Sequence, residues 1–137
     1  MPFYGCSVPA GSLTDDQKHD LARAITRIHT EVTGASPALV HVLFNEVASA
    51  ALYSGGECAS EIIIAGDIRA ARSYADKERI LREVGGACAA ITGRSLDTIA
   101  VVLRDVPAKN IFERGEIAPG LGEDEAWLAA WGTGPAQ

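Results

Sequence analysis

The chain repeats a pattern of strand, helix and strand, and the two copies are offset by 59 residues. In each copy a Thr or Ser that can cap a helix precedes four apolar residues at helical spacing, and a Thr-Gly pair ends the helix. The matching positions are Thr14 and Ser73, Leu21 and Ile80, Ile25 and Val84, Ile28 and Ala87, Val32 and Ile91, and Gly34 and Gly93. Agreement at both helix boundaries and at four apolar positions indicates an internal duplication.

Apolar runs flank both helices and predict the strands. They cover residues 3–8 and 39–44 in the first copy, and residues 61–65 and 98–103 in the second. Right-handed β-α-β connections place both helices on the same face of a sheet. We therefore predict an α+β fold in which tandem duplicated β-α-β units form a four-stranded mixed sheet with two helices on one face.

One domain accounts for all 137 residues. The first repeat is expected at about 2–46 and the second at about 61–104. A C-terminal arm, at about 108–137, is rich in Gly and Pro, so it is expected to be mostly irregular and to lie outside the repeat. A short helix is expected to begin near Glu123, with Trp127 and Trp131 on one side of it. The second face of the sheet has no predicted cover, which favours packing against further copies of the chain.

Composition excludes several classes of function. The net charge of −6 argues against a nucleic-acid partner. No apolar run approaches the ~20 residues that span a bilayer, and the first residues do not resemble a signal peptide. The odd number of cysteines, Cys6, Cys58 and Cys88, has no metal-binding spacing. They are interpreted as buried, reduced thiols of a cytoplasmic protein.

Pro2 is the first candidate for chemistry. Removal of the initiator methionine, which is usual before a small residue, would leave a secondary amine at the terminus. An ordinary α-amino group has a pKa of about 7.7–8.0. Burial or neighbouring cations would lower that pKa and give a base that works near neutral pH. The alternative is that Pro2 only favours an extended first strand.

Further candidates are charged or titratable side chains that also have ordinary explanations. His29 lies at the edge of the first apolar stripe, where a structural histidine is common. Arg69 and Arg72 follow the third strand and can hold a carboxylate through paired hydrogen bonds, or they can be solvated loop residues paired with nearby aspartates. Glu113 can equally be interpreted as an ordinary charged residue on the surface. His19 and His41 are interpreted as ordinary surface and strand residues.

Short motifs along almost the whole chain resemble the tautomerase superfamily. They are Met1-Pro2-x-Tyr4, Leu13-Thr14, Ala24-Ile25-Thr26-x-x-His29, Thr33-Gly34, Arg69-x-x-Arg72-Ser73, Pro107-Ala108, and Glu113 before Gly115. The chain is most similar to the branch with two β-α-β units, typified by cis-3-chloroacrylic acid dehalogenase. Their order and spacing carry the resemblance more than any single motif does.

The resemblance implies a homotrimer and a catalytic amino-terminal proline, here Pro2. It also implies that His29, Arg69 and Arg72 bind a small anionic carboxylate substrate. Glu113 occupies the place of a glutamate that activates water together with a tyrosine. The aligned tyrosine position is Val102, which cannot form a hydrogen bond through its side chain.

This departure favours the less demanding reaction. We expect a tautomerase that interconverts a small 2-keto acid and its enol, with no metal and no organic cofactor. The first alternative is a hydratase or dehalogenase of short unsaturated or 3-halo-acrylic acids, with Tyr4, Tyr53 or Tyr74 replacing the missing tyrosine. The second is a non-catalytic trimeric binding protein.

Overall fold

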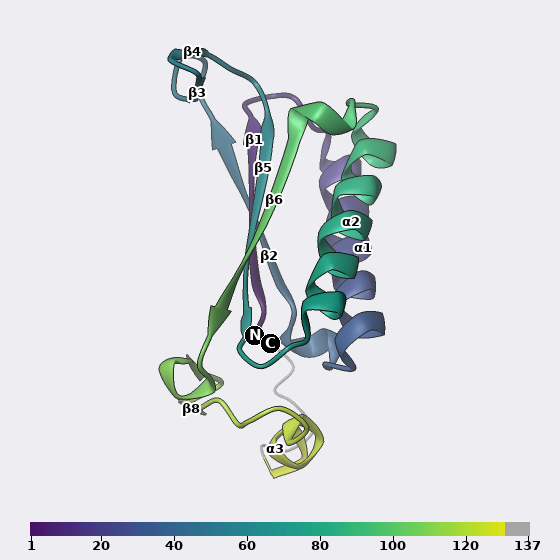
Figure 1. Ribbon diagram of the computed structural model, residues 1–137, viewed down its shortest axis with the longest axis vertical. Coiled ribbons are helices and arrows are strands. Elements are labelled where there is room, and N and C mark those ends of the chain that lie inside the picture. Colours follow the sequence, from purple (N-terminus) through teal and green to yellow (C-terminus); the bar gives the residue numbers. More distant parts are fainter. Residues whose placement is uncertain (131–137) are drawn as a thin grey trace.

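A computed structural model describes residues 1–130 and shows one four-stranded sheet with two long helices packed on one face (Figure 1). The sheet consists of β1 (Phe3–Pro9), β2 (His41–Val47), β5 (Ile62–Arg69) and β6 (Ile99–Val106), and the helices are α1 (Asp15–Thr33) and α2 (Tyr74–Thr92). Three-residue 3₁₀ turns, η1 (Pro37–Leu39), η2 (Leu96–Thr98) and η3 (Ala108–Asn110), precede β2, β6 and the final hairpin. The predicted α+β fold is confirmed.

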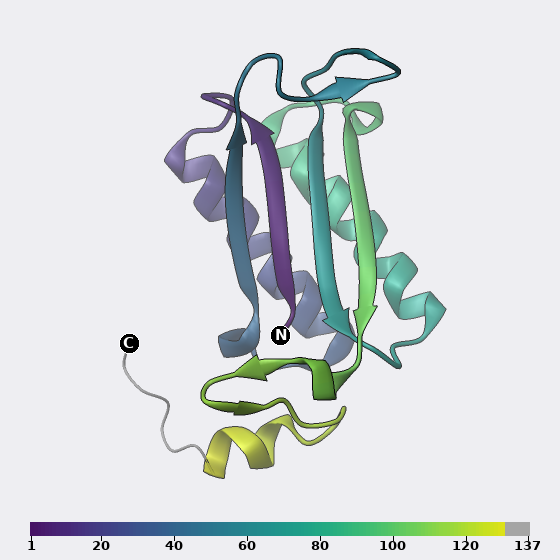
Figure 2. The ribbon, with the colours of Figure 1, turned by 90° about the vertical axis from the view of Figure 1, so that its left-hand side faces the viewer.

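The strand order is β2-β1-β5-β6, and Figure 2 shows the four strands side by side in front of the helices. β1 is parallel to β2, β5 is parallel to β6, and the central pair β1–β5 is antiparallel. Each β-α-β unit is thus a parallel pair with its own helix. The two units meet through their first strands, so that equivalent features lie at opposite ends of the sheet.

The helix boundaries follow from the capping residues. The Thr14 hydroxyl accepts a hydrogen bond from the Gln17 backbone, and the Gln17 side chain returns one to the Thr14 backbone. Ser73 caps α2 in the same position. Both helices end at a glycine in the left-handed region, Gly34 at φ 76° and Gly93 at φ 74°. The helices therefore have equal lengths and keep the offset of 59 residues.

The first strands of the two units are offset by 60 residues instead. Phe3 lies opposite His41, whereas Ile63 lies opposite Ala100, the residue 59 positions after His41. The connection between strand and helix is one residue shorter in the second unit, which restores the offset of 59 at the helix. Because side chains alternate between faces, an offset of 59 along this strand would have exposed its apolar set.

The core lies between the helices and the helix-facing side of the sheet. Tyr4, Cys6 and Val8 alternate along β1 and are buried against Leu21 and Ile25 of α1. The equivalent layer from β5 and α2 completes the core. The residues of that layer are Ile62, Ile64, Ile68, Ile80, Val84 and Cys88. Gly66 faces Tyr4 across the β1–β5 pair, and a Cβ there would lie 2.5 Å from the Tyr4 ring. The absence of a side chain at Gly66 therefore makes room for Tyr4.

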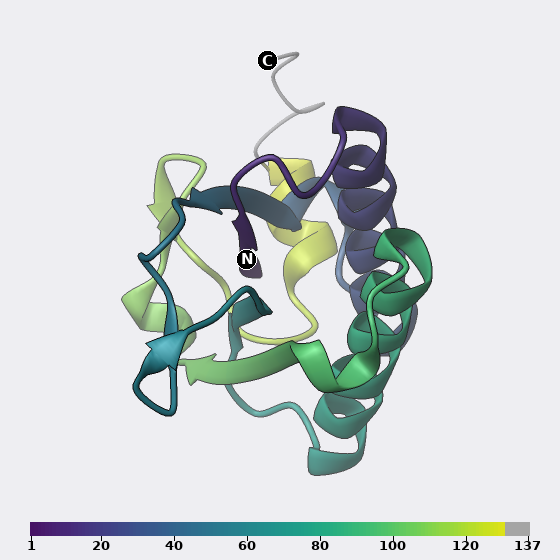
Figure 3. The ribbon, with the colours of Figure 1, turned by 90° about the horizontal axis from the view of Figure 1, so that it is seen from above.

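The correspondence between the units extends to a hairpin after each of them. The first hairpin is β3 (Tyr53–Ser54) with β4 (Glu57–Cys58), and the second is β7 (Phe112–Glu113) with β8 (Glu116–Ile117). Both turns have two residues in the left-handed region, Gly55-Gly56 and Arg114-Gly115. Figures 1 and 3 show both hairpins projecting on the side of the sheet away from the helices. The segment that begins at residue 108 was expected to lie outside the repeat, but it starts with this repeated hairpin.

The remaining arm forms one short helix, α3 (Asp124–Ala130), close to the expected start at Glu123. Trp131 lies outside the described residues, so the pairing of Trp127 with Trp131 stays a prediction. All three cysteines are free thiols, but Cys58 is exposed on β4, which corrects the expectation that all three are buried. Among residues 1–130, no helix is long and apolar enough to cross a membrane.

Candidate active site

The amino terminus lies at one end of the sheet, close to α3 and the β7–β8 hairpin (Figures 1 and 2). Met1 is only 4% exposed, and its amino group donates to the Leu39 carbonyl at 3.0 Å. The same amino group contacts both oxygens of the Glu113 carboxylate, with Oε2 at 2.7 Å. The nitrogen of Pro2 is part of a peptide bond here. The carbonyl of Pro2 accepts a hydrogen bond from the His41 backbone nitrogen at 3.0 Å. The chain terminus is therefore fixed on both sides.

Glu113 reaches the terminus because of the second hairpin. It ends β7 directly before Arg114, which has a φ of 56°. Arg114 donates to the Ala38 carbonyl at 3.1 Å and so holds the hairpin against η1. The Glu113 side chain is 6% exposed, and its second partner is His41 Nε2, 3.0 Å from Oε2. Glu113 is thus a buried carboxylate between an amine and an imidazole, not a surface charge.

The environment tunes the terminal amine. Burial is the largest effect and lowers the pKa of the Met1 amino group below its ordinary value of 8.0. The hydrogen bond and the charge of Glu113 act in the opposite direction, Arg69 lowers the pKa further, and Asp124 raises it. Desolvation prevails, so a terminal amine at this position is more readily neutral at pH 7 than one in water.

His29 is buried beside this end of the sheet. It is 3% exposed, and its Nδ1 lies 2.9 Å from the Tyr4 hydroxyl. Burial lowers the pKa of His29 to about 3, and the charges of Arg72, the terminal amine and Arg69 lower it in the same direction. His29 is therefore neutral at physiological pH. Since burial raises the pKa of the Tyr4 phenol, a phenol that donates to Nδ1 leaves the imidazole proton on Nε2, available to a ligand.

Arg69 and Arg72 have different surroundings. Arg69 is 5% exposed and is held by the Asp124 carboxylate at 2.7 Å and by the carbonyls of Pro119 and Gly120. Arg72 is partly buried, and one of its guanidinium nitrogens donates to the Thr33 carbonyl at 3.0 Å. Burial and the charge of Arg69 both lower the pKa of Arg72, which places the two guanidinium groups in one electrostatic neighbourhood.

The pairing that sequence alone suggested for the arginines does not occur. Asp67, a suggested partner, binds Arg104 on the neighbouring strand at 2.7 Å. The backbone nitrogen of Asp76 donates to the Ser73 hydroxyl that caps α2. The actual partner of Arg69 is Asp124 of the arm, 55 residues further along the chain. The neighbourhood thus joins groups from four separate segments, which are the chain terminus, His29, the stretch with Arg69 and Arg72, and Glu113.

The tyrosine expected as partner of Glu113 is not supplied from elsewhere among the described residues. Val102 lies on the open face of β6 and is 49% exposed. Tyr53 and Tyr74 are exposed, at 55% and 79%, and Tyr4 is committed to His29. The group that does contact Glu113 is His41, which sequence reasoning missed. The two residues are 72 positions apart, and only the fold of the hairpin brings them together.

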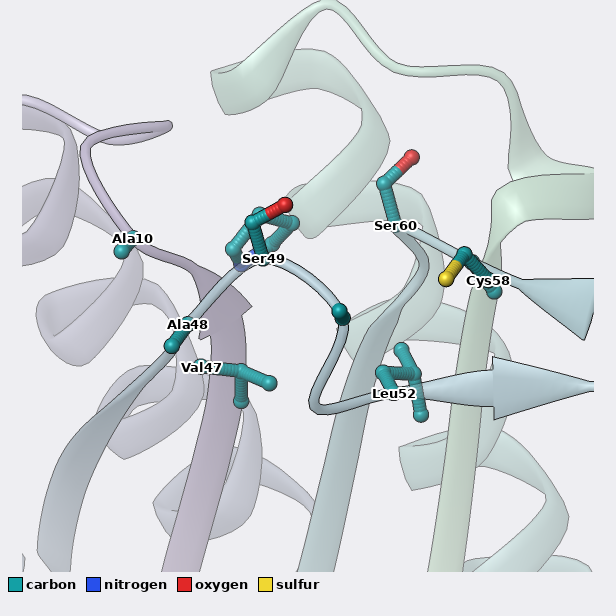
Figure 4. Close-up of a pocket in the computed structure, with 10 residues that line it drawn as sticks. Ala10, Val47, Ala48, Ser49, Leu52, Cys58 and Ser60 are labelled. Atoms are coloured by element: carbon teal, nitrogen blue, oxygen red, sulfur yellow. The ribbon is translucent and has the colours of Figure 1, made fainter.

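The opposite end of the sheet shows what this site looks like without a chain terminus. A pocket of about 350 Å³ lies there beside the β3–β4 hairpin (Figure 4). Its lining includes Val47, Leu52 and Ala59, and the residues 59 positions later are Val106, Ile111 and Ala118. Those three residues pack around the Met1 side chain at the candidate site. Met1 therefore fills a space that is open in the other unit.

The end of the sheet beside the first hairpin lacks the chemical groups as well as the terminus. The position of Glu113 is taken by Ser54, whose hydroxyl donates to Glu61 at 2.7 Å. No Asp, Glu, Lys, Arg or His lines the pocket at that end. Within residues 1–130 there is also no cluster of three or more His, Cys, Asp or Glu side chains that could hold a metal ion. Within residues 1–130, the candidate groups therefore lie at one end of the sheet.

Comparisons with known proteins agree with this geometry. A family model described as "Putative oxalocrotonate tautomerase enzyme" matches residues 1–130. The crystal structure of native Ps01740 is 38% identical, covers 81% of this chain and 99% of its own, and superposes with a TM-score of 0.79.

N1, a member of the cis-3-chloroacrylic acid dehalogenase family, is 27% identical over 97% of this chain and 92% of its own, with a TM-score of 0.89. Native fused 4-OT, at 22% identity and a TM-score of 0.78, covers 85% of this chain and 95% of its own and shows the same fold. No curated protein matches the chain. The chain belongs to the oxalocrotonate tautomerase family and lies in the tautomerase superfamily, near the branch of cis-3-chloroacrylic acid dehalogenase.

Proposed function

We propose that this protein is a tautomerase that interconverts a small 2-keto acid and its enol, with the amine of Pro2 as the general base. The observation that carries the proposal is the amino group of Met1, which is buried, has a lowered pKa and contacts Glu113 directly beside Pro2. Such an amine can accept a proton near neutral pH. Membership of the tautomerase superfamily supports catalysis of this kind.

Removal of Met1 is the step that makes the site competent. While Met1 is present, the Pro2 nitrogen is an amide, and the Met1 side chain fills the space between Val106, Ile111 and Ala118. Its removal exposes a secondary amine and opens that space to a ligand. The open pocket at the opposite end of the sheet supports this expectation, because the equivalent wall there encloses about 350 Å³.

The proposed reaction uses only side chains of this chain. Arg72, together with Arg69, binds the substrate carboxylate by charge-assisted hydrogen bonds. The Pro2 amine takes the proton from the enol hydroxyl and returns it to the adjacent carbon, and the reverse sequence converts ketone to enol. His29 donates from Nε2 to the substrate oxygen, whose negative charge grows during the transfer. No metal and no organic cofactor takes part.

A second reaction deserves a test because Glu113 has a hydrogen-bonding partner after all. With His41 on its Oε2, Glu113 is placed to activate water next to the amine. The relative N1 belongs to the cis-3-chloroacrylic acid dehalogenase family. Water addition to short unsaturated or 3-halo-acrylic acids is therefore the alternative activity, and a non-catalytic binding protein is the remaining one.

A substrate panel separates these functions. Protein whose mass shows loss of Met1 is mixed with phenylenolpyruvate, and ketonisation is followed by absorbance. A parallel series uses short unsaturated and 3-halo-acrylic acids, with release of halide or hydrated product as readout. We expect catalysed ketonisation with little product from the second series. Product from the second series alone would favour the hydratase, and turnover in neither would leave the binding protein.

We further propose that three copies assemble in the cytoplasm. The face of the sheet opposite the helices exposes Leu43 at 63%, Val102 at 49% and Phe3 at 40%. An exposed apolar surface of this kind is typical of an interface between subunits. A fused 4-OT of the same fold forms a symmetric trimer. Light scattering is expected to give three times the chain mass of 14.3 kDa, and the mass of a single chain would contradict the assembly.

A further inference from the structure

We propose that His41 is a positioning residue that holds the Glu113 carboxylate toward the terminal amine. The inference rests on the proposed function and adds a residue to it. His41 begins β2 as an exposed residue, and its Nε2 lies 3.0 Å from Glu113 Oε2. An ionised carboxylate can only accept hydrogen bonds, so Nε2 carries the proton and donates it.

The imidazole is held in place from two directions. Its ring stacks on Phe3 of the neighbouring strand, with 5.0 Å between the ring centroids and 23° between the planes. Its backbone nitrogen donates to the Pro2 carbonyl at 3.0 Å. His41 is therefore attached through its main chain to the proposed base and through its side chain to the carboxylate beside that base. Any movement of Glu113 relative to Pro2 would have to break one of these contacts.

Glu113 needs such a support because its own element is small. β7 and β8 have two residues each, so the hairpin offers little backbone pairing of its own. Among the described residues, the Glu113 side chain contacts the Met1 amino group and His41. Removal of Met1 ends the contact between Glu113 and the Met1 amino group. The hydrogen bond from His41 is the contact that does not depend on Met1.

The charges around His41 favour this pairing. Asp67 and Arg104 share its row of the open sheet face but bind each other at 2.7 Å and 3.1 Å. The hairpin brings Glu113 and Arg114, and Arg114 donates to the Ala38 carbonyl. The terminal amine contacts both oxygens of Glu113, including the Oε2 that His41 contacts. The carboxylate that His41 contacts is therefore that of Glu113. Asp67, the acidic residue in the same row of the sheet face, binds Arg104 and not His41.

Substitutions that differ in reach test the hydrogen bond. His41→Gln places an amide donor close to the position of Nε2, whereas the shorter His41→Asn does not, and His41→Leu removes the donor. We expect His41→Leu and His41→Asn to lower kcat for enol ketonisation, because a displaced Glu113 no longer orients the terminal amine that it contacts. The expected decrease is about 10- to 100-fold, the size typical of residues that orient the ligands of catalytic metals. KM should change little, because His41 does not touch substrate. His41→Gln should retain most of kcat.

The decisive comparison is a double-mutant cycle with Glu113→Gln. If His41 acts through Glu113, His41→Leu combined with Glu113→Gln should be no slower than Glu113→Gln alone. His19 is an exposed histidine on α1, so His19→Leu serves as the matched control and should leave kcat unchanged. Circular dichroism and light scattering of each variant verify fold and assembly.

The outcomes separate this inference from the proposed function. Equal kcat for His41→Gln and His41→Leu, full additivity in the cycle, or wild-type activity of His41→Leu would overturn the positioning role. In each of those cases the role of Pro2 could still stand. An active enzyme whose rate does not depend on Pro2 would instead overturn the proposed function, whatever the His41 variants do.

Discussion

Replacing Pro2 with alanine is expected to lower kcat/KM for enol ketonisation by about 100-fold or more, within the range typical of removing a general base. The substitution retains a buried position next to β1 but replaces the ring nitrogen with a flexible primary amine. The measurement is the rate of phenylenolpyruvate ketonisation at several pH values. Mass spectrometry of both proteins must show that Met1 is absent, so that each presents its second residue as the terminus.

Pro9→Ala is the matched control for this substitution. Pro9 ends the same strand at the opposite end of the sheet, next to the pocket of the first hairpin. Its replacement should leave the rate within about threefold of wild type, since surface and end-of-strand changes rarely alter a distant site. A protein that retains Met1 should be inactive, because its Pro2 nitrogen is an amide and cannot act as the base. Equal rates for wild type and Pro2→Ala would remove Pro2 from the mechanism.

Replacing Arg72 with alanine should produce the second large effect. Loss of a charge-assisted contact to a desolvated carboxylate typically costs 2–5 kcal/mol, which corresponds to a decrease of at least about 30-fold in kcat/KM. The decrease should appear mainly in KM, because the carboxylate is bound in substrate and transition state alike. Arg72→Lys should recover part of it, since a lysine keeps the charge without the planar pair of donors.

Arg72 is a cleaner test than Arg69. Arg69 is held by Asp124 and by two carbonyls of the arm, so its removal would release the arm as well as the substrate. The control is Arg79→Ala, which removes an exposed guanidinium from the same helix region and breaks only its contact with Glu83. An unchanged KM for Arg72→Ala, with Arg79→Ala also unchanged, would show that Arg72 does not bind substrate.

The sequence was sufficient to predict the architecture because local signals define it. The Thr14 and Ser73 caps and the two glycine stops gave both helices their boundaries. The strands are longer than their apolar runs. β5 continues to Arg69, because pairing with β1 and β6 extends the strand beyond the apolar run from which it was predicted.

The hairpin β7–β8 was missed for a physical reason. Each strand has two residues, too few to show an alternating pattern. Its turn places Arg114 in the left-handed region, where the first hairpin has Gly55. Comparison with that first hairpin, 59 residues earlier, would have been the available signal. Without it, Glu113 has no visible connection to the terminus in the sequence.

The site could be predicted only as far as the resemblance reached. Pro2, His29, Arg69 and Arg72 were named from motifs. The structure brings His29, Arg69 and Arg72 into one electrostatic neighbourhood with the amino group of Met1, the residue before Pro2. The partners were not predictable, because each contact joins distant segments. His41 meets Glu113 only when β2 and the last hairpin are both in place. Asp124 meets Arg69 only when the arm folds back over the end of β5.

The most direct test is an NMR titration of the Pro2 nitrogen in protein from which Met1 has been removed. Burial should hold the pKa of this amine below the ordinary α-amino range of about 7.7–8.0. Glu113 raises the pKa of the Met1 amino group and Arg69 lowers it. If the Pro2 amine has the same neighbours, Glu113→Gln should decrease the measured value further. The activity should rise with pH as the amine loses its proton, with its midpoint at the titrated pKa. A Pro2 pKa of 8 or above, or a midpoint of activity that does not follow it in Glu113→Gln, would contradict the tuned base.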